Sequence, residues 1–308
     1  MLDQNTDRMW YVIGAVLIGA AIIFGMNTLM PELFASVTEN FEGVSNQVSS
    51  TIEVEMKNQQ TKKEIKGKEI ANVTEGLLLY YDLTQGSGNT IIDRSGNGKN
   101  ATLVGFNHNS ESGWVDNGLL FDDVDDYAIG PSNLVFPDNT ITLQARVSFH
   151  GLDHEGDTGT LGTLLKKGHP DNVSPHTGFA LSYENRGGRS DFSYTAFGNP
   201  SGGFNGGGNS FDGRNSHYKL ENNRTYSLTV TVDENAVGRI YIDGMLKFEK
   251  QFTDEVNLNN SDELLIGMWT KSMVYHGYSK TIESIRIYDR TLDPLEVLMN
   301  HKYDTRSD

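Results

Sequence analysis

Hydrophobic residues form one long uninterrupted region near the start of the chain. No residue over 9–31 is charged, and the stretch WYVIGAVLIGAAIIFGMNTLM, which begins at Trp10, is mostly apolar. A helix of this length spans the roughly 30 Å hydrocarbon core of a bilayer at about 1.5 Å per residue. We therefore predict a transmembrane helix here. Arg8 is the only basic residue before it, so the positive-inside rule places residues 1–8 in the cytoplasm and the body outside the cell.

Two other interpretations of this apolar region stay open. A cleaved signal peptide has an apolar core of about 7–15 residues followed by a site with two small residues. Here the apolar run is longer, and the nearest candidate site, which ends at Ala35, has the bulky Leu33 two positions earlier. A buried core helix is the other interpretation, but an apolar run of this length at the N-terminus favours an uncleaved anchor.

A second hydrophobic pattern follows the predicted span and has the period of a helix. Its residues recur every three or four positions, in the order Phe34, Val37, Phe41, Val44, Val48, Ile52 and Met56. This spacing predicts an amphipathic helix whose apolar stripe needs a partner. The partner is either the protein's own folded domain or the stripe of another copy. The charged stretch QQTKKEIKGKEIANV comes next, so we predict a stalk and linker over residues 32–75.

The rest of the chain alternates apolar and polar residues with a period of two. ITLQARVSF, from Ile141 to Phe149, has every second residue apolar, which predicts a strand with one buried face. YSLTVTVD and RIYIDG repeat the pattern, and Asp243-Gly244 predicts a turn after RIYIDG. LLIG and SIRIYD are further predicted strands. Asp293 predicts the cap of one short helix. Many short strands separated by turns are typical of an antiparallel sandwich.

Composition narrows the range of functions. The 308 residues include 41 Asp and Glu against 25 Lys and Arg, which gives a net charge of −16. Such a chain lacks the basic surface that neutralises phosphates, so we expect no nucleic-acid partner. It also has no cysteine, which excludes disulfides, Cys-ligated zinc and a thiol nucleophile.

Several segments of the body occur in a characteristic order. They are GLLLYYDLTQGSGNTIIDRSGNGKNATLVG, GLLFDDVDDYAIG, TITLQARVSF, TLLKKG, TYSLTVTVD, GRIYIDGMLK, LLIGM and TIESIRIYDRTLDPLEV. Together they resemble the laminin-G-like, or concanavalin A-like, jelly-roll domain over about residues 76–303. The resemblance implies an all-β domain of two stacked antiparallel sheets over residues 76–308, which binds glycans or protein ligands, in some members with calcium. The chain departs from the pattern at Glu283-Ser284, where one acidic residue is missing, and in a long Gly-rich loop over 198–215.

The same superfamily also contains glycan hydrolases, so catalysis has to be considered. Those enzymes need two carboxylates roughly 5–10 Å apart across a cleft, typically from Glu-x-Asp-x-x-Glu in one strand. No such array is present; the nearest segment, ESIRIYD, carries Glu283 and Asp289 with Arg286 between them. The nucleophile motif G-x-S-x-G is absent as well. We therefore expect a protein that binds rather than an enzyme.

Acidic residues in two loops are candidate calcium ligands. DRSGNG has the spacing of the first half of an EF-hand loop, but Asp93 is its only carboxylate and Val104 stands where the bidentate Glu would be. A tight turn explains this segment better. FDDVDDY adds Asp122, Asp123, Asp125 and Asp126, whose charges repel one another unless a cation counters them. The alternative is that Asp125 and Asp126 shape a turn by accepting backbone N–H bonds. Calcium therefore stays a possible cofactor, with Asp93, Asp125 and Asp126 as its candidate ligands.

Aromatic residues in loops are the candidate glycan-binding groups, because a sugar ring stacks on an exposed aromatic face. MWTKSMVYHGYSK lies between two predicted strands and contains Trp269, Tyr275, His276 and Tyr278. A loop exposes its aromatic residues more than a strand does, so this segment is the first candidate and Trp114 is the second. The alternative is that these side chains only cover one end of the sandwich.

These patterns predict a membrane-anchored surface protein whose jelly-roll head binds glycan or protein ligands. A pilin-like subunit of an extracellular filament is the alternative, with residues 9–31 bundled in the core of the fibre and the heads outside. The chain lacks the Gly-Phe-Thr-Leu-x-Glu motif of type IV pilins. The filament interpretation therefore depends on architecture alone.

Overall fold

A computed structural model describes residues 31–122, 124–150, 160–169, 177–186, 189–197, 210–211, 220–253, 255–269 and 279–306. The contacts within the chain divide it into two compact units, Met1–Met56 and Lys57–Asp308.

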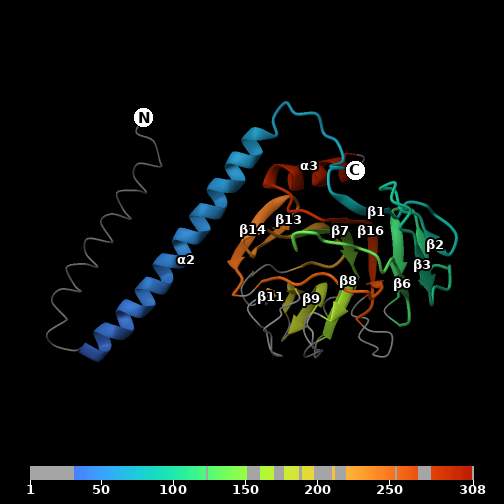
Figure 1. Ribbon diagram of the computed structural model, residues 1–308. Helices are drawn as coiled ribbons and strands as arrows, with labels where there is room; N and C mark the ends of the chain where they lie inside the picture. Colours follow the sequence, from blue (N-terminus) through green and yellow to red (C-terminus); the bar gives the residue numbers. More distant parts are fainter. Residues whose placement is uncertain are drawn as a thin grey trace. The chain divides into compact units, whose positions relative to one another are not determined.

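Helix α2 begins in the first unit and ends in the second. It runs from Pro31 to Glu64 and is drawn in blue in Figure 1. Among the described residues, no helix is long and apolar enough to cross a membrane. The predicted span over residues 9–31 lies outside the described part of the chain except for Pro31.

The described part of the apolar stripe on α2 is exposed. Its residues are 52–68% exposed, namely Val44, Val48, Ile52 and Met56. The side chains of Phe34, Val37 and Phe41 lie outside the described set. The predicted helix is confirmed, because α2 includes the whole stripe. The helix continues for eight residues beyond the stripe, into the predicted linker.

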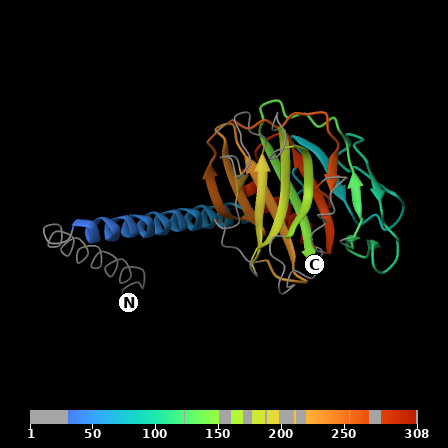
Figure 2. The ribbon, with the colours of Figure 1, turned by 90° about the horizontal axis from the view of Figure 1, so that it is seen from below.

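The second unit contains two stacked antiparallel sheets, as the sequence predicts (Figures 1 and 2). Among the described residues sheet A has eight strands, which are β1 (Leu77–Asp82), β4 (Gly113–Val115), β5 (Gly118–Phe121), β7 (Ile141–Phe149), β12 (Thr225–Val232), β13 (Val237–Ile242), β14 (Met245–Gln251) and β16 (Lys280–Tyr288). Their order is β14-β13-β12-β7-β16-β5-β4. Strands β1 and β5 pair with the same edge of β16. Strand β5 pairs with the N-terminal half of β16 and β1 with its C-terminal half.

Sheet B forms the other layer and also has eight strands in the described part of the chain. They are β2 (Thr90–Ile91), β3 (Ala101–Val104), β6 (Tyr127–Ile129), β8 (Thr160–His169), β9 (Thr177–Arg186), β10 (Arg189–Phe197), β11 (Ser210–Phe211) and β15 (Leu264–Ile266). Their order is β11-β10-β9-β8-β15-β6-β3-β2. Apolar side chains of both sheets meet in one core, so the predicted two-sheet sandwich is confirmed.

Strand β7 shows how the alternation of the sequence is used. Its odd-numbered residues point into the core: Ile141, Leu143, Ala145, Val147 and Phe149. The prediction that only this face is buried is wrong, because the polar residues between them are 0–8% exposed: Thr142, Gln144, Arg146 and Ser148. Helix α3 (Pro294–Asp304) covers this outer face, and Asn300 Nδ2 donates to Gln144 Oε1 at 2.7 Å. A second layer therefore lies on the polar side of sheet A (Figure 1).

The turn and the cap that the sequence predicts are both present. Asp243 and Gly244 have φ values of 52° and 74°, as a two-residue hairpin between β13 and β14 requires. Asp293 caps α3: its side chain accepts from the Glu296 backbone, and the Glu296 side chain accepts from the Asp293 backbone. The turn places β14 beside β13, and the cap fixes the start of α3.

The stretch predicted as a linker lies against the sandwich. Asn58 pairs with the backbone of Leu246 in β14 through two hydrogen bonds, of 2.9 Å to its carbonyl and 2.8 Å from its N–H. Asn72 accepts a 2.8 Å hydrogen bond from Arg286, and the carbonyl of Val73 accepts one from Tyr288. Residues 57–75 therefore form part of the second unit.

Candidate functional site

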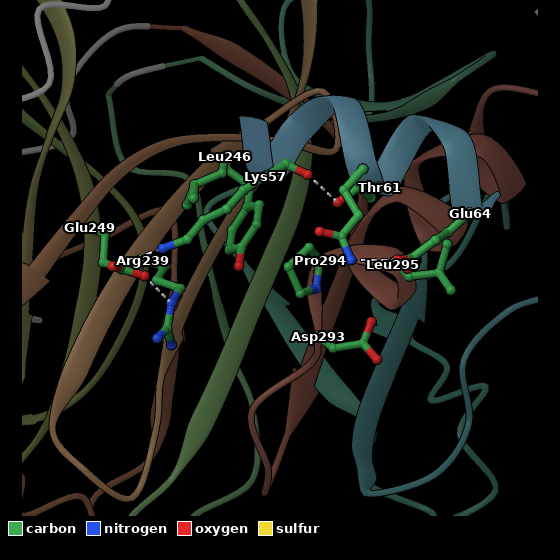
Figure 3. A pocket seen from close by; sticks show the side chains of 11 residues that line it. Lys57, Thr61, Glu64, Arg239, Leu246, Glu249, Asp293, Pro294 and Leu295 are labelled. Atoms are coloured by element: carbon green, nitrogen blue, oxygen red, sulfur yellow. Dashed lines mark hydrogen bonds and ion pairs between the residues drawn. The ribbon is translucent and has the colours of Figure 1, made fainter. Parts of the chain in front are cut away.

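A cavity of about 410 Å³ lies where the end of α2 meets sheet A and the start of α3 (Figure 3). All of its lining residues belong to the second unit. They are Lys57, Gln60, Thr61 and Glu64 from α2, Arg239 and Tyr241 from β13, Leu246 and Glu249 from β14, and Asp293, Pro294 and Leu295 around the start of α3.

The end of α2 forms one wall because two of its polar side chains are buried against the hairpin. Asn58 and Thr61 are 7% and 6% exposed. The amide of Asn58 makes the paired bonds with Leu246, as a neighbouring strand would, and Thr61 Oγ1 donates to the carbonyl of Lys57 at 2.9 Å. The two bonds of Asn58 fix this end of α2 to β14, whereas the bond of Thr61 lies within the helix.

The two cations of the cavity share one carboxylate (Figure 3). Glu249 accepts from Arg239 Nε at 2.5 Å and from Lys57 Nζ at 3.2 Å, and Arg239 also bonds Asp233 at 2.7 Å. Burial alone would raise the pKa of Glu249, but the hydrogen bonds and charges of Arg239 and Lys57 outweigh it and lower that pKa. Glu249 is therefore ionised at neutral pH and neutralises positive charge in the cavity.

The remaining polar lining groups are mostly hydrogen-bond acceptors. Glu64 accepts from Gln60 at 2.8 Å, and Asp293 Oδ1 accepts from the Glu296 backbone at 2.8 Å. The Tyr241 hydroxyl is buried and has no hydrogen-bond partner within the described residues. Burial raises the pKa of Tyr241, so its hydroxyl stays protonated.

Three carboxylates gather at a second place, the turn between β5 and β6. Ligand oxygens of Asp122, Asp125 and Asp126 lie within 4.8 Å of one another. Asp126 is 2% exposed and accepts from the Asp122 backbone at 2.9 Å. Burial, with a further contribution from the charge of Asp122, raises the pKa of Asp126 to about 6. The structure thus brings together Asp122, Asp125 and Asp126 of the acidic segment FDDVDDY, as three oxygen donors that could hold a cation.

Asp93 is not a member of this group, and its carboxylate already accepts four hydrogen bonds. Their donors are the backbone N–H groups of Tyr80, Ser95 and Lys99 and the Ser95 hydroxyl, at 2.8–3.0 Å. Burial alone would raise the pKa of Asp93, but these bonds outweigh it and lower the pKa. Gly96 and Gly98 have positive φ, so the interpretation of DRSGNG as a tight turn is confirmed.

The predicted aromatic site is only partly described. Tyr275, His276 and Tyr278 lie outside the described residues. Trp269 is 5% exposed and stacks against Lys166 of β8, whose Nζ lies 4.7 Å from the ring centroid. The expectation that Trp269 is exposed is therefore wrong, because the residue follows β15 closely and packs on the neighbouring strand. Trp114 is half-buried against the core, and its Nε1 donates to the Gly88 carbonyl at 2.7 Å.

The cavity itself was not foreseen from the sequence. Its walls come from three segments far apart in the chain, around residues 57–64, 239–249 and 293–295, and none of them carries a binding motif. The signal that could have indicated it is the regular placement of Asn58 and Thr61 beyond the apolar stripe, in a stretch that composition alone describes as a linker.

Comparisons with known proteins agree on the fold. A sequence model for the concanavalin A-like lectin/glucanases superfamily matches residues 122–298, which is more than half of the chain. No curated protein matches. Among solved structures, a Trypanosoma rangeli sialidase holding 2,3-difluorosialic acid as a covalent intermediate is similar, with 17% identity, a TM-score of 0.54, and coverage of 84% of this chain and 40% of the sialidase.

Two toxin domains are similar as well. The binding domain of Paraclostridial Mosquitocidal Protein 1 has 15% identity and a TM-score of 0.54, and that of botulinum neurotoxin serotype D has 14% identity and a TM-score of 0.53. In each case the match covers 75% of this chain and 52% of the toxin chain. This chain therefore spans about half or less of the structures that it resembles, and identities of 14–17% show a shared fold alone.

Proposed function

Because the chain belongs to the concanavalin A-like lectin/glucanase superfamily, we propose that its sandwich is the recognition head of a surface protein that binds glycan or protein ligands. The family match over residues 122–298 carries this proposal, since it covers most of both sheets. Fold alone does not assign a function. What supports binding is the combination of a lectin-superfamily fold with a cavity lined by both polar and apolar side chains.

The head binds rather than catalyses in this proposal. The sialidase among the similar structures is an enzyme, so the surroundings of the nearest candidate carboxylates bear on this part of the proposal. Glu283, one of the two in ESIRIYD, accepts from Arg146 at 2.5 Å and from Asn117 at 3.0 Å. The pair with Arg146 supports a structural role for Glu283, because a carboxylate beside an arginine gives up its proton easily and is a poor general acid.

The head is attached to the cell surface through the N-terminal region. Residues 9–31 form a membrane anchor, and the apolar stripe over residues 34–56 associates with other copies of the chain. The exposure of Val44, Val48, Ile52 and Met56 supports this self-association, because an apolar stripe that continues from an anchor is stabilised by a partner.

A glycan array tests the recognition step. The 308-residue chain is kept in a detergent without a sugar head group, and binding is measured with and without a calcium chelator. We expect selective retention by a subset of glycans. Retention by no glycan, together with no binding to extracted cell-surface protein, would refute the recognition function. A loss of binding on chelation would assign calcium to the head, with Asp122, Asp125 and Asp126 as its first candidates.

The alternative function, a pilin-like filament subunit, is favoured by one observation. Helix α2 is 34 residues long and carries exposed apolar residues on part of its length, as a helix that bundles with its copies would. Negative-stain microscopy of native surface material separates the two functions. Fibres support the filament, whereas particles that detergent extracts as monomers or small oligomers support the anchored receptor.

A further inference from the structure

We propose that the cavity between the end of α2, the β13–β14 hairpin and the start of α3 is a binding site for an uncharged, hydroxyl-rich ligand of one or two sugar rings. Four of its lining residues, Lys57, Gln60, Thr61 and Glu64, precede the segment matched by the family. The site therefore combines residues inside the matched segment with residues of α2 that precede it. The evidence for this site is the cavity and its lining, so the proposal does not depend on whether the sandwich also binds a ligand elsewhere.

The volume of the cavity sets the size of the ligand. Ligand pockets range from about 300 to 1,000 Å³, and this one, at about 410 Å³, lies near the lower end. It is large enough for one or two rings and too small for a folded protein segment. A short saccharide fits this volume.

The paired charges select against an anionic ligand. Lys57 and Arg239 both bond the carboxylate of Glu249 (Figure 3). Arg239 has a second partner in Asp233. An acidic sugar would have to compete with these carboxylates for the same donors. With Glu64 and Asp293 counted, the lining carries three carboxylates against two cations. A carboxylate-bearing ligand such as sialic acid is therefore disfavoured.

The acceptors of the lining select for a ligand that donates hydrogen bonds. The carboxylates of Glu64 and Asp293 line the same space as the amide of Gln60 and the hydroxyl of Thr61. Each carboxylate has two oxygens and about four lone-pair sites. Within the described residues Glu64 accepts one side-chain bond and Asp293 accepts one backbone bond. Adjacent sugar hydroxyls can both donate to such groups and accept from the amide.

The apolar part of the lining selects for a ligand with a C–H face. Leu246, Pro294 and Leu295 line the cavity together with Tyr241. A sugar ring presents C–H groups on one face and hydroxyls around its edge, which matches a lining of this mixed kind. A polyamine has methylene groups that could cover the apolar part, but it has no acceptor for the amide of Gln60 or for the cations Lys57 and Arg239.

Saturation-transfer NMR and calorimetry on the 308-residue chain, again in a detergent without a sugar head group, test this site. The probes are methyl glucoside, methyl galactoside, methyl mannoside, maltose, cellobiose and lactose, with N-acetylneuraminic acid and spermidine as the charged comparisons. We expect at least one neutral sugar to bind, and to bind at least about tenfold more tightly than either charged probe. Binding of none of the neutral sugars, or tighter binding of spermidine or N-acetylneuraminic acid, would overturn the proposal.

Gln60→Trp locates the binding. Gln60 is an exposed helix residue, so an indole there fills the cavity without disturbing the core, and we expect the affinity to fall by about tenfold or more. Gln59→Trp is the matched control, because Gln59 is exposed one position away and does not line the cavity. Equal binding by both variants and the unaltered chain would overturn the assignment of this site. If array binding survives in Gln60→Trp, another part of the sandwich carries the recognition function, and the small-sugar measurements on the same variant decide this site separately.

A second variant changes the selectivity instead of blocking the cavity. Glu249→Gln removes the carboxylate that Lys57 and Arg239 share, so the lining loses one negative charge, while Arg239 keeps its bond to Asp233. We expect N-acetylneuraminic acid to gain affinity relative to the neutral sugars by about tenfold. An unchanged ratio, measured on a variant whose melting temperature stays near that of the unaltered chain, would show that the paired charges do not set the selectivity.

Discussion

Two regions of this molecule reverse the usual relation between polarity and burial. On the outer face of sheet A, Arg286 and Asn300 are polar and 1% exposed, whereas on α2 the apolar Val48 and Ile52 are 52% and 55% exposed. The buried residues have partners at short distance: Asn300 bonds Gln144, and Arg286 bonds Asp304 twice, at 2.6 and 2.7 Å. The comparison teaches that the available partners, rather than polarity, decide what is buried here.

Arg286→Met tests the buried side of this comparison and has the largest expected effect. The substitution removes the arginine that pairs with Asp304, the last residue of α3, and it removes the bond from Arg286 to Asn72. Breaking a buried pair by removing one partner costs about 3–5 kcal/mol of the free energy of unfolding, which urea denaturation measures. Arg224→Met is the matched control: Arg224 is 45% exposed in its pair with Asp243, and such a pair contributes about 0–1 kcal/mol. Equal losses in the two variants would contradict the comparison.

Asn58→Leu tests whether hydrogen bonds hold the end of α2 to the sandwich. Leucine keeps the side-chain size but leaves the Leu246 N–H and carbonyl without the bonds from Asn58. We expect a loss of about 2 kcal/mol in the free energy of unfolding. We also expect faster amide exchange over residues 57–65. Gln59→Leu, at the exposed neighbouring position, should change the stability by about 0.5 kcal/mol or less. If Asn58→Leu is as stable as this control, apolar contacts hold the helix instead.

The comparison also explains how much of the fold the sequence could predict. A period of two identified β7, β12, β13 and β16, because the core-facing residues of these strands are apolar on alternate positions, whereas β15 is a short apolar run. The burial of Gln144 and Arg146 was not predictable in this way. The sequence pattern is the same whether a polar residue faces water or is covered by a helix. Only the position of α3 distinguishes the two cases.

The candidate site was predicted less well for a similar reason. Asp125 and Asp126 are adjacent to their partner Asp122 in the chain, so local sequence could suggest that cluster. The cavity depends on the contact between α2 and β14, where Asn58 bonds Leu246, a residue 188 positions away in the sequence. No local pattern encodes such a contact. Trp269 was predicted to be exposed but is buried, because it packs against Lys166 in another strand.

Asp126→Asn tests a buried polar group with too few partners, and its expected effect is smaller. The folded pKa of Asp126, about 6, lies above its ordinary value of 3.8. The folded state therefore binds the proton more tightly, and the stability that this gives is present below about pH 4 and lost as the pH rises through 6. At pH 7 the neutral asparagine should raise the free energy of unfolding by about 1 kcal/mol. Calorimetric melting from pH 4 to 7 measures this.

Calcium sharpens the Asp126 experiment. If Asp122, Asp125 and Asp126 hold a cation, added calcium should raise the melting temperature of the unaltered chain and have little effect on Asp126→Asn. Asp116→Asn is a matched control, since Asp116 lies outside the acidic group. A melting temperature that calcium and chelator leave unchanged would show that the raised pKa reflects burial without a bound ion.

Ile52→Glu tests the exposed side of the comparison and has the smallest expected effect on folding. Because Ile52 is 55% exposed, a charge there should change the free energy of unfolding of the sandwich by about 0.5 kcal/mol or less. The same charge in the apolar stripe should dissociate the self-associated chain, which sedimentation in detergent measures as a fall in protein mass. Ser45→Glu, exposed and off the stripe, is the control and should keep the larger mass. A fall in sandwich stability without a change in mass would mean that the stripe packs on the protein's own domain. An unchanged mass and stability would mean that it has neither partner, so this one substitution separates the two interpretations that the helical period leaves open.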